Sequence, residues 1–227
     1  MLQFQNLAKQ YQLGQQRVEA LSNVTGEISN GEMVALCGPS GSGKSTLLNI
    51  LGLLDSEYEG QVTLDGSLYP KEPQQSAQLR RTSMGFVFQR FNLVPVMSAW
   101  ENVAYPLMLN GYSAKQQQRL AMEMLGKVGL EEFAHHRPDH LSGGQQQRVA
   151  IARALVHQPK LVIADEPTAS LDSHTAQRVI ELMKALGHEL GTTFIVATHD
   201  QRMANQCDRP LSLVDGRISE EAMKWAS

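Results

Sequence analysis

One short segment constrains the fold of this chain more than any other part of its sequence. Residues 38–46 read Gly-Pro-Ser-Gly-Ser-Gly-Lys-Ser-Thr and fit the pattern G-x-x-x-x-G-K-[S/T]. The apolar run Met33–Cys37 precedes the segment, and a helical run at residues 47–51 follows it. Glycines allow backbone N–H groups to turn toward an anion, and a helix start directs its positive end at the same place. The segment therefore predicts a strand, a phosphate-binding loop and a helix, in that order.

The side chains of this loop have expected roles in binding a nucleoside phosphate. Lys44 should reach the β- and γ-phosphates, and the Ser45 hydroxyl should ligate Mg²⁺. The other predicted binding residues of the loop are Gly38, Ser40, Gly41, Ser42, Gly43 and Thr46. The alternative is a glycine-rich turn without a ligand, which the flanking strand and helix disfavour. Cys37 is expected to be a small buried residue, with oxidative inhibition beside the phosphates as the other interpretation.

Short apolar runs alternate with helical patterns, and this alternation predicts the fold class. The runs that read as buried strands are Met33–Cys37, Met84–Phe88, residues 161–164 and Thr193–Ala197. With helical patterns between them, they favour an α/β fold with a mostly parallel core sheet covered by helices. Residues 2–7 and 18–28 are more typical of antiparallel strands, so we expect an N-terminal antiparallel β subdomain as well.

Between residues 91 and 158 the strand signal disappears, and two apolar stripes at helical spacing replace it. The stripes consist of Trp100, Val103, Ala104, Leu107 and Met108, and of Leu120, Met124, Leu125 and Val128. Pro106 is expected to kink or break the first helix. Glutamine runs at 116–118 and 145–147 are interpreted as solvated helix faces. The prediction is one domain over residues 1–227, with a core from 1–90 and 159–227 and an inserted helical subdomain at 91–158.

Composition narrows the classes of function. The 227 residues suit one globular domain with a sizeable core, since 42% of them are hydrophobic. The formal net charge of -3 gives no reason to expect nucleic-acid binding. Cys37 and Cys207 are far apart in sequence, which suits a reducing compartment. We expect no signal peptide, and no apolar run approaches the roughly 20 residues that span a bilayer, so a membrane role would need a partner.

Two acidic residues and a histidine follow predicted strands. Asp165 and Glu166 come at the end of the strand predicted at 161–164, where the carboxyl edge of a parallel sheet forms a ligand crevice. Asp165 is expected to hold Mg²⁺, and Glu166 to polarise the attacking water as a general base. His199 follows the strand Thr193–Ala197, where a role beside the γ-phosphate is favoured over capping or packing. Asp200 could fix its tautomer or cap the next helix.

A second glycine pair opens another helical pattern. Residues 141–148 read Leu-Ser-Gly-Gly-Gln-Gln-Gln-Arg and precede an apolar helix at 149–155. Ser142, Gly143, Gly144 and Gln145 at a helix start can form a second anion site. The alternative is an ordinary helix N-cap, because Ser142 and Gln145 satisfy a capping box. Taken alone, the cap interpretation is preferred.

Taken with the other motifs, this segment gives the chain a clear resemblance to the ABC ATPases. Gln89 follows residues 86–88 as the family's Q-loop glutamine, and residues 170–172 follow the acidic pair as its D-loop. Together with the phosphate loop, the Leu-Ser-Gly-Gly-Gln signature and His199, these motifs stand in the family's order over nearly the whole chain. The resemblance implies a P-loop NTPase cassette that binds ATP and Mg²⁺.

The resemblance also implies residue roles and partners. It assigns catalysis to Glu166, His199 and Gln89, and metal binding to Ser45, Gln89 and Asp165. It places Tyr11 against adenine. It implies a head-to-tail dimer in which the signature residues and Asp172 complete the partner's ATP site. A separate transmembrane permease would meet residues 90–101 from the membrane side, which puts the chain on the cytoplasmic face of the cell membrane.

Within this family, the chain resembles the lipoprotein-releasing and macrolide-export branch. The motifs that carry this likeness lie at residues 51–55, 85–89 and 101–107, whereas Ala169 and Ser170 replace the Gly-Asn of many members. The branch implies mechanical transmission across the membrane for export or extraction of a lipoprotein, peptide or drug, with a periplasmic adaptor as a further candidate partner. The alternatives are a cell-division-type ATPase that regulates a membrane protein, and an amino-acid importer ATPase. The extra C-terminal domain of sugar importers is not expected.

Residues 135–140 bring three histidines close together in sequence. Adjacent histidines cannot easily share one tetrahedral ion, and no cysteine or further histidine lies at useful spacing. The segment is therefore interpreted as a loop ahead of the signature helix rather than as a metal site.

Overall fold

A computed structural model describes residues 1–14 and 16–219 of the chain. Within these residues, six strands form a core sheet in the order β10-β9-β3-β8-β7-β6. Their bounds are β3 (Met33–Cys37), β6 (Met84–Phe88), β7 (Leu161–Asp165), β8 (Thr193–Ala197), β9 (Arg209–Val214) and β10 (Arg217–Ser219). All neighbouring pairs are parallel except β9 with β10. The predicted α/β fold class with a mostly parallel core sheet is confirmed.

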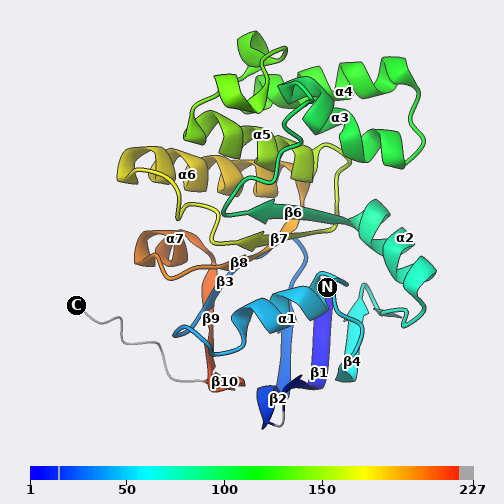
Figure 1. The fold of residues 1–227 in the computed structure, drawn as a ribbon, viewed down its shortest axis with the longest axis vertical. Coiled ribbons are helices and arrows are strands. Elements are labelled where there is room, and N and C mark those ends of the chain that lie inside the picture. Colours follow the sequence, from blue (N-terminus) through cyan, green and yellow to red (C-terminus); the bar gives the residue numbers. More distant parts are fainter. Residues whose placement is uncertain (15, 220–227) are drawn as a thin grey trace.

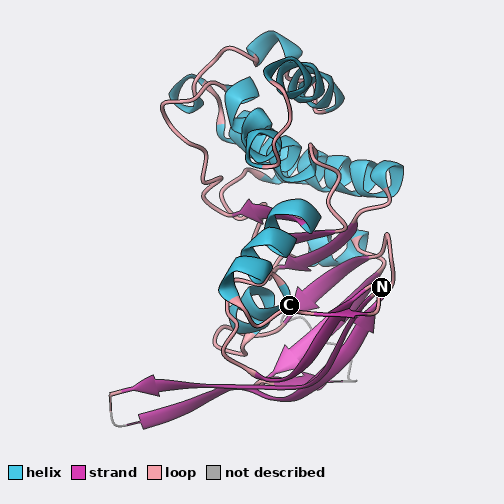
Figure 2. Cartoon of the chain, turned by 90° about the vertical axis from the view of Figure 1, so that its right-hand side faces the viewer, coloured by secondary structure: helices cyan, strands magenta, loops and turns pink. Residues whose placement is uncertain are grey.

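A second sheet of the described residues is antiparallel and lies below the core in Figure 1. Its order is β2-β1-β4-β5, from strands β1 (Leu2–Leu13), β2 (Gln16–Ile28), β4 (Glu59–Leu64) and β5 (Ser67–Leu68). Strands β1 and β2 are longer than the sequence pattern predicted, and Figure 2 shows their hairpin extending beyond the body of the molecule. The expected antiparallel N-terminal part is therefore present.

Helices gather at the opposite end of the molecule, as Figures 1 and 2 show. Residues 91–158 contain α3 (Ala99–Leu109), α4 (Ala114–Lys127), α5 (Gly143–Leu155) and two short 3₁₀ turns, η1 (Glu131–Phe133) and η2 (Pro138–His140). Helix α3 continues through Pro106 to Leu109, so the proline does not break it. Pro106 lies in the last turn of α3, so the hydrogen bond that a proline removes is close to the end of the helix.

Helices α1 (Lys44–Leu51), α6 (Ser173–Leu190) and α7 (Gln201–Gln206) cover the core sheet, whereas α2 (Pro73–Ser83) lies beside its edge strand β6 (Figure 1). Strand β3 alternates between two apolar clusters: Ala35 packs with the cluster that contains the signature-helix side chains, and Leu36 packs with the cluster beneath α1. No helix within the described ranges combines the length and apolarity needed to cross a membrane.

Candidate functional site

The phosphate loop joins the buried strand β3 to helix α1, as its sequence predicts. A Cβ on Gly38 would lie 2.1 Å from the carbonyl oxygen of Leu213, and one on Gly43 would lie 2.4 Å from that of Ala20. Gly43 also has a φ of 100°, which side chains rarely adopt. Packing against β2 and β9 therefore requires glycine at both ends of the loop, independently of any ligand.

The loop presents polar groups suited to an anion. The Lys44 ammonium donates hydrogen bonds to the carbonyl oxygens of Gly38 (2.7 Å) and Pro39 (2.8 Å), so it is folded over the loop. Ser42 is buried, and its hydroxyl has no hydrogen-bond partner among the described residues. A buried hydroxyl without a partner is costly, so phosphate oxygens would satisfy a group that the fold leaves open.

The catalytic candidates lie where β7 and β8 end, at the same edge of the core sheet as the loop. Glu166 has a φ of 48°, an uncommon conformation for a residue other than glycine, and its N–H donates to Ala197 O (2.9 Å). Its carboxylate lies 2.8 Å from His199 Nδ1, with the histidine 72% exposed and the glutamate 21% exposed. The structure thus brings the predicted base into direct contact with His199, which was predicted to lie beside the γ-phosphate.

The remaining groups of this edge fit the predicted metal site. Burial raises the pKa of Asp165, Glu166 raises it further, and Lys44 opposes both. A carboxylate that burial destabilises is stabilised by a nearby cation. Asp165, Ser45 and Gln89 offer oxygen donors, the type that Mg²⁺ prefers, and the exposure of Ser45 and Gln89 leaves room for phosphate and water ligands. The donor set fits Mg²⁺.

Two neighbouring residues have more definite structural roles. Asp200 accepts from Arg202 N–H at the start of α7 and forms an ion pair with the Arg202 guanidinium, so it caps the helix. Of the two roles predicted for Asp200, the structure supports the cap, and His199 pairs with Glu166 instead. Burial raises the pKa of Cys37 to about 11, an increase that Lys44 opposes and Glu166 reinforces. A neutral buried thiol is a poor nucleophile, which agrees with the packing interpretation.

Tyr11 and Gln89 lie on exposed parts of the structure. The Tyr11 ring is half-buried, its hydroxyl lies 3.5 Å from Asp55 Oδ2, and the Lys9 ammonium lies 5.1 Å from the ring centroid. The Gln89 side chain is exposed, and the backbone carbonyl oxygen of Gln89 accepts from the Ser170 hydroxyl (3.1 Å). The roles of Tyr11 and Gln89 in nucleotide binding stay predictions.

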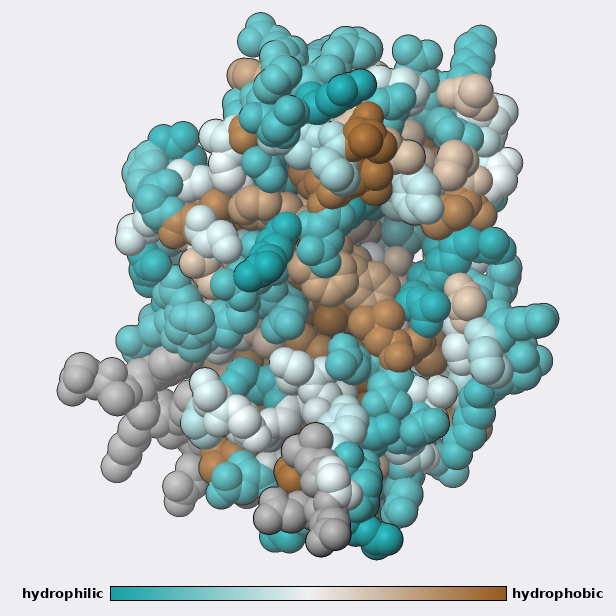
Figure 3. Space-filling model, in the orientation of Figure 1, coloured by the Kyte–Doolittle hydropathy of each residue, from teal (hydrophilic) through white to brown (hydrophobic). Residues whose placement is uncertain are grey.

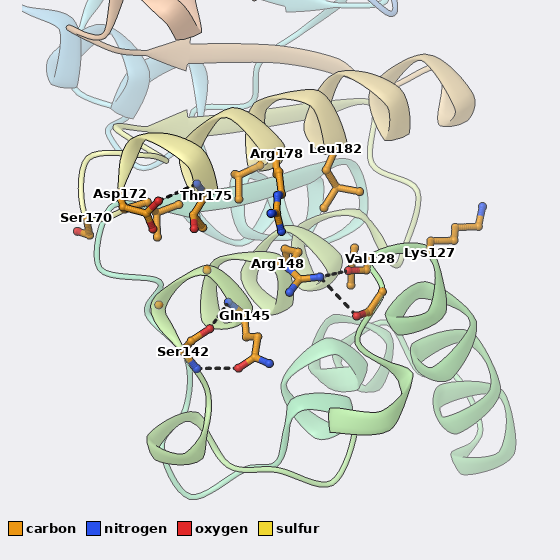
Figure 4. Close-up of a pocket in the computed structure, with 15 residues that line it drawn as sticks. Lys127, Val128, Ser142, Gln145, Arg148, Ser170, Asp172, Thr175, Arg178 and Leu182 are labelled. Atoms are coloured by element: carbon orange, nitrogen blue, oxygen red, sulfur yellow. Dashed lines mark hydrogen bonds between the residues drawn. The ribbon is translucent and has the colours of Figure 1, made fainter.

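The signature residues lie at the start of α5, in a cavity of about 640 Å³ shared with the beginning of α6. The Ser142 hydroxyl accepts from Gln145 N–H, and the Gln145 side chain accepts from Ser142 N–H, which forms the predicted capping box. Asp172 caps α6 by accepting from the N–H groups of His174 and Thr175. Figure 4 shows both helix starts facing the cavity. No residue of the phosphate loop lines it.

The burial of Gln147 contradicts the sequence prediction. The run 145–147 was expected to be a solvated face, but Gln147 is fully buried and its amide donates to Pro167 O at 2.5 Å. This contact joins the signature helix to the residue that follows Glu166. The three glutamines of this run have the same polarity. Gln147 differs from the other two only because it lies on the side of α5 that is buried. Helical periodicity, which aligns residue 147 with Ile151, Ala154 and Leu155, could have indicated it.

Replacing Lys44 by alanine is expected to weaken ATP binding by about tenfold or more, because hydrogen bonds to charged groups are worth about 1.5–3 kcal/mol. Hydrolysis should fall with it. Titration of the variant with a fluorescent ATP analogue measures the affinity. Lys71→Ala, which removes an exposed lysine just before α2, is the matched control and should bind as the native chain does. Equal affinities in the two variants would contradict the role given to Lys44.

The fold and these sites define a nucleotide-binding protein of the P-loop class, and comparison with known proteins gives its family. Residues 21–169 match the family model described as ABC transporter. The chain is 45% identical to an uncharacterized ABC transporter ATP-binding protein, MJ0796, of Methanocaldococcus jannaschii, over 97% of this chain and 96% of that protein. It is 48% identical to one of Thermotoga maritima, over 92% of this chain and 90% of that protein.

Solved structures give the same result. A dimeric structure of the cassette MJ0796 bound to ADP and Pi has a TM-score of 0.88 at 43% identity, with full coverage of both chains. The structure of cbiO1 from Clostridium perfringens, described as part of the ABC transporter complex cbiONQ, has a TM-score of 0.86 at 29% identity and covers 96% of this chain and 86% of that one. This chain belongs to the ABC transporter ATP-binding family, and the predicted ABC-type ATPase is confirmed.

Proposed function

We propose that this chain works as one half of an ATP-dependent dimer that drives a separate membrane permease. One observation is the main support for the dimer. The phosphate loop and the signature residues at the start of α5 both suit an anion, yet no phosphate-loop residue lines the signature cavity. A second copy, facing head-to-tail, would bring its phosphate loop to that cavity. The solved structures of MJ0796 are dimeric, which supports a dimer of this chain by analogy.

In this proposal each nucleotide lies between two subunits. The phosphate loop and Tyr11 of one subunit hold ATP, and Ser142, Gly143, Gly144, Gln145 and Asp172 of the other subunit complete the site. Mg²⁺ at Ser45, Gln89 and Asp165 would neutralise phosphate charge. Glu166 acts as the general base toward water, and the hydrogen bond that its carboxylate accepts from His199 Nδ1 holds it in place.

An apolar groove of about 570 Å³ supports a permease as the other partner. Phe86, Phe88, Tyr105 and Leu109 are among its lining residues, and the segment 90–101 contributes Asn92 and Val94. Figure 3 shows apolar side chains gathered in the middle of this face, between the helical part and the core. The charged residues that line the groove are Arg80, Arg81 and Arg153. The groove therefore suits a helix with an apolar face and an acidic residue.

The resemblance of the motifs to the export branch supports a proposal about what the permease would transport. We propose export or extraction of a lipoprotein, peptide or drug by mechanical transmission, with the chain on the cytoplasmic face of the membrane and a periplasmic adaptor as a further component. The domain proposal is a single ATPase unit in which residues 91–158 form the helical insertion. A cell-division-type regulator and an amino-acid importer ATPase are the alternatives, and a neighbouring gene for a periplasmic binding protein would favour the importer.

The permease proposal predicts that Tyr105→Glu and Leu109→Glu reduce co-purification with the permease whose gene adjoins this one. Both side chains are partly exposed in the groove, so a carboxylate there would lose apolar contact and should weaken association by about tenfold or more. Leu68→Glu is the matched control, since Leu68 is exposed on β5 outside the groove. Equal recovery of the permease with all three variants would rule out this docking surface.

A further inference from the structure

The turn after Gln89 has an unusual backbone. Phe91 and Asn92 are consecutive and have φ values of 59° and 49°, in the left-handed region. Asparagine tolerates this region, whereas phenylalanine is uncommon there. A left-handed pair without glycine persists only where surrounding contacts hold it in place. The contacts that hold this turn should therefore matter to whatever the turn does.

Arg153, near the end of the signature helix α5, supplies those contacts. Its guanidinium donates to Asn92 O (2.6 Å) and to Phe91 O (2.9 Å), so both carbonyls of the left-handed pair are held by one side chain. Burial lowers the pKa of this arginine. Within residues 1–14 and 16–219, no carboxylate forms an ion pair with it. A half-buried cation that is compensated only by two carbonyl oxygens costs folding free energy, which argues for a specific role of Arg153.

The same turn touches the signature. A Cβ built on Gly143 would lie 3.8 Å from the tip of the Phe91 ring, so this ring packs beside the first residue of α5. Asn92 and Arg153 both line the apolar groove proposed for the permease. The groove, the left-handed turn and the signature are therefore in direct contact through two side chains.

We propose that Arg153 is a positioning residue, which fixes the Phe91–Asn92 turn so that the Phe91 ring holds the signature end of α5 in the place needed for the partner's ATP. An occupant of the groove that displaces Asn92 or Arg153 would then shift the signature. This proposal rests on the ATP-dependent dimer proposed above, and it adds a route by which the permease side reaches that dimer.

The test measures ATP-driven dimerisation by analytical ultracentrifugation in a Glu166→Gln background. Arg153→Lys keeps the positive charge but lacks the planar guanidinium whose N–H groups donate to both carbonyls. It should weaken dimerisation by about tenfold, the effect of losing one hydrogen bond to a charged group. Arg153→Met should weaken it at least as much. ATP affinity of the monomer should stay unchanged in both, because neither contact of Arg153 involves the phosphate loop.

Two further variants separate positioning from general destabilisation. Phe91→Ala should reproduce the defect, and combining it with Arg153→Lys should add little, because both changes interrupt the same path. Arg119→Lys is the matched control, since Arg119 is exposed on α4 in an ion pair with Glu123, and it should dimerise normally. If Arg153→Met fails to fold, Arg153→Lys still decides the question.

Different outcomes overturn different proposals. If Arg153→Lys and Arg153→Met dimerise normally while Ser142→Arg does not dimerise, the role proposed for Arg153 is wrong and the proposed dimer stands. Equal loss of ATP affinity and dimerisation would indicate a general structural role and would also overturn it. If Ser142→Arg dimerises as well, the proposed dimer itself is wrong.

Discussion

Replacing Glu166 by glutamine is expected to abolish ATP turnover while an ATP-bound dimer accumulates. A general base contributes about 10²–10⁴-fold to a rate, and the amide cannot accept the proton from water. The glutamine has nearly the same shape, and its amide can still form a hydrogen bond to His199 Nδ1, which lies 2.8 Å from the native carboxylate. Nucleotide binding should therefore survive, and the variant should stop at the state before hydrolysis.

Single-turnover phosphate release and size-exclusion chromatography with ATP measure the two halves of this prediction. Glu123→Gln is a suitable control, because Glu123 is an exposed acid on α4 whose ion-pair partner is Arg119. It should hydrolyse ATP at the native rate and show no accumulated dimer. Rapid hydrolysis by Glu166→Gln would exclude Glu166 as the base, and another group at this edge of the sheet would have to take its place.

Ser142→Arg is expected to prevent ATP-driven dimerisation. Ser142 is exposed at the start of α5, where a long side chain would occupy the space that the partner's nucleotide needs. The change also removes a helix cap, worth about 1 kcal/mol, because the Ser142 hydroxyl accepts from Gln145 N–H. The steric effect should dominate, so monomeric ATP binding should stay normal while hydrolysis, which the proposed dimer would carry out, should fall to background.

A second capping serine of the chain, Ser113, provides a matched control for Ser142→Arg. Ser113 caps α4 with the same capping box, through Gln116, and lies outside the signature cavity. Ser113→Arg therefore removes an equivalent cap without obstructing the signature, and it should dimerise with ATP. Ser142→Thr, which keeps a hydroxyl, should dimerise too. Sedimentation velocity with Glu166→Gln as the background distinguishes these cases, and an unaffected profile for Ser142→Arg would exclude the sandwich arrangement.

Much of the fold could be read from local patterns. Strands β3, β6 and β8 begin and end where the apolar runs do, because strands buried on both faces show as continuous apolar segments. Helix α2, with a low apolar content and only Ser76 buried, gives no such signal and was not predicted. The burial of Gln147 was missed because its polar neighbours obscure the helical periodicity that places it on the buried side of α5.

The local sequence is enough to specify the phosphate loop, because the glycines, Lys44 and Ser45 act within one short segment and need only the adjoining strand and helix. It also determined the capping box at Ser142, which is local to one helix turn. Three contacts depend on the packing of the whole fold: Glu166 with His199, Gln147 with Pro167, and Arg153 with the left-handed turn at Phe91, 62 residues earlier. Those contacts join segments distant in sequence, and no local pattern records which side chains the packing of separate elements will bring together.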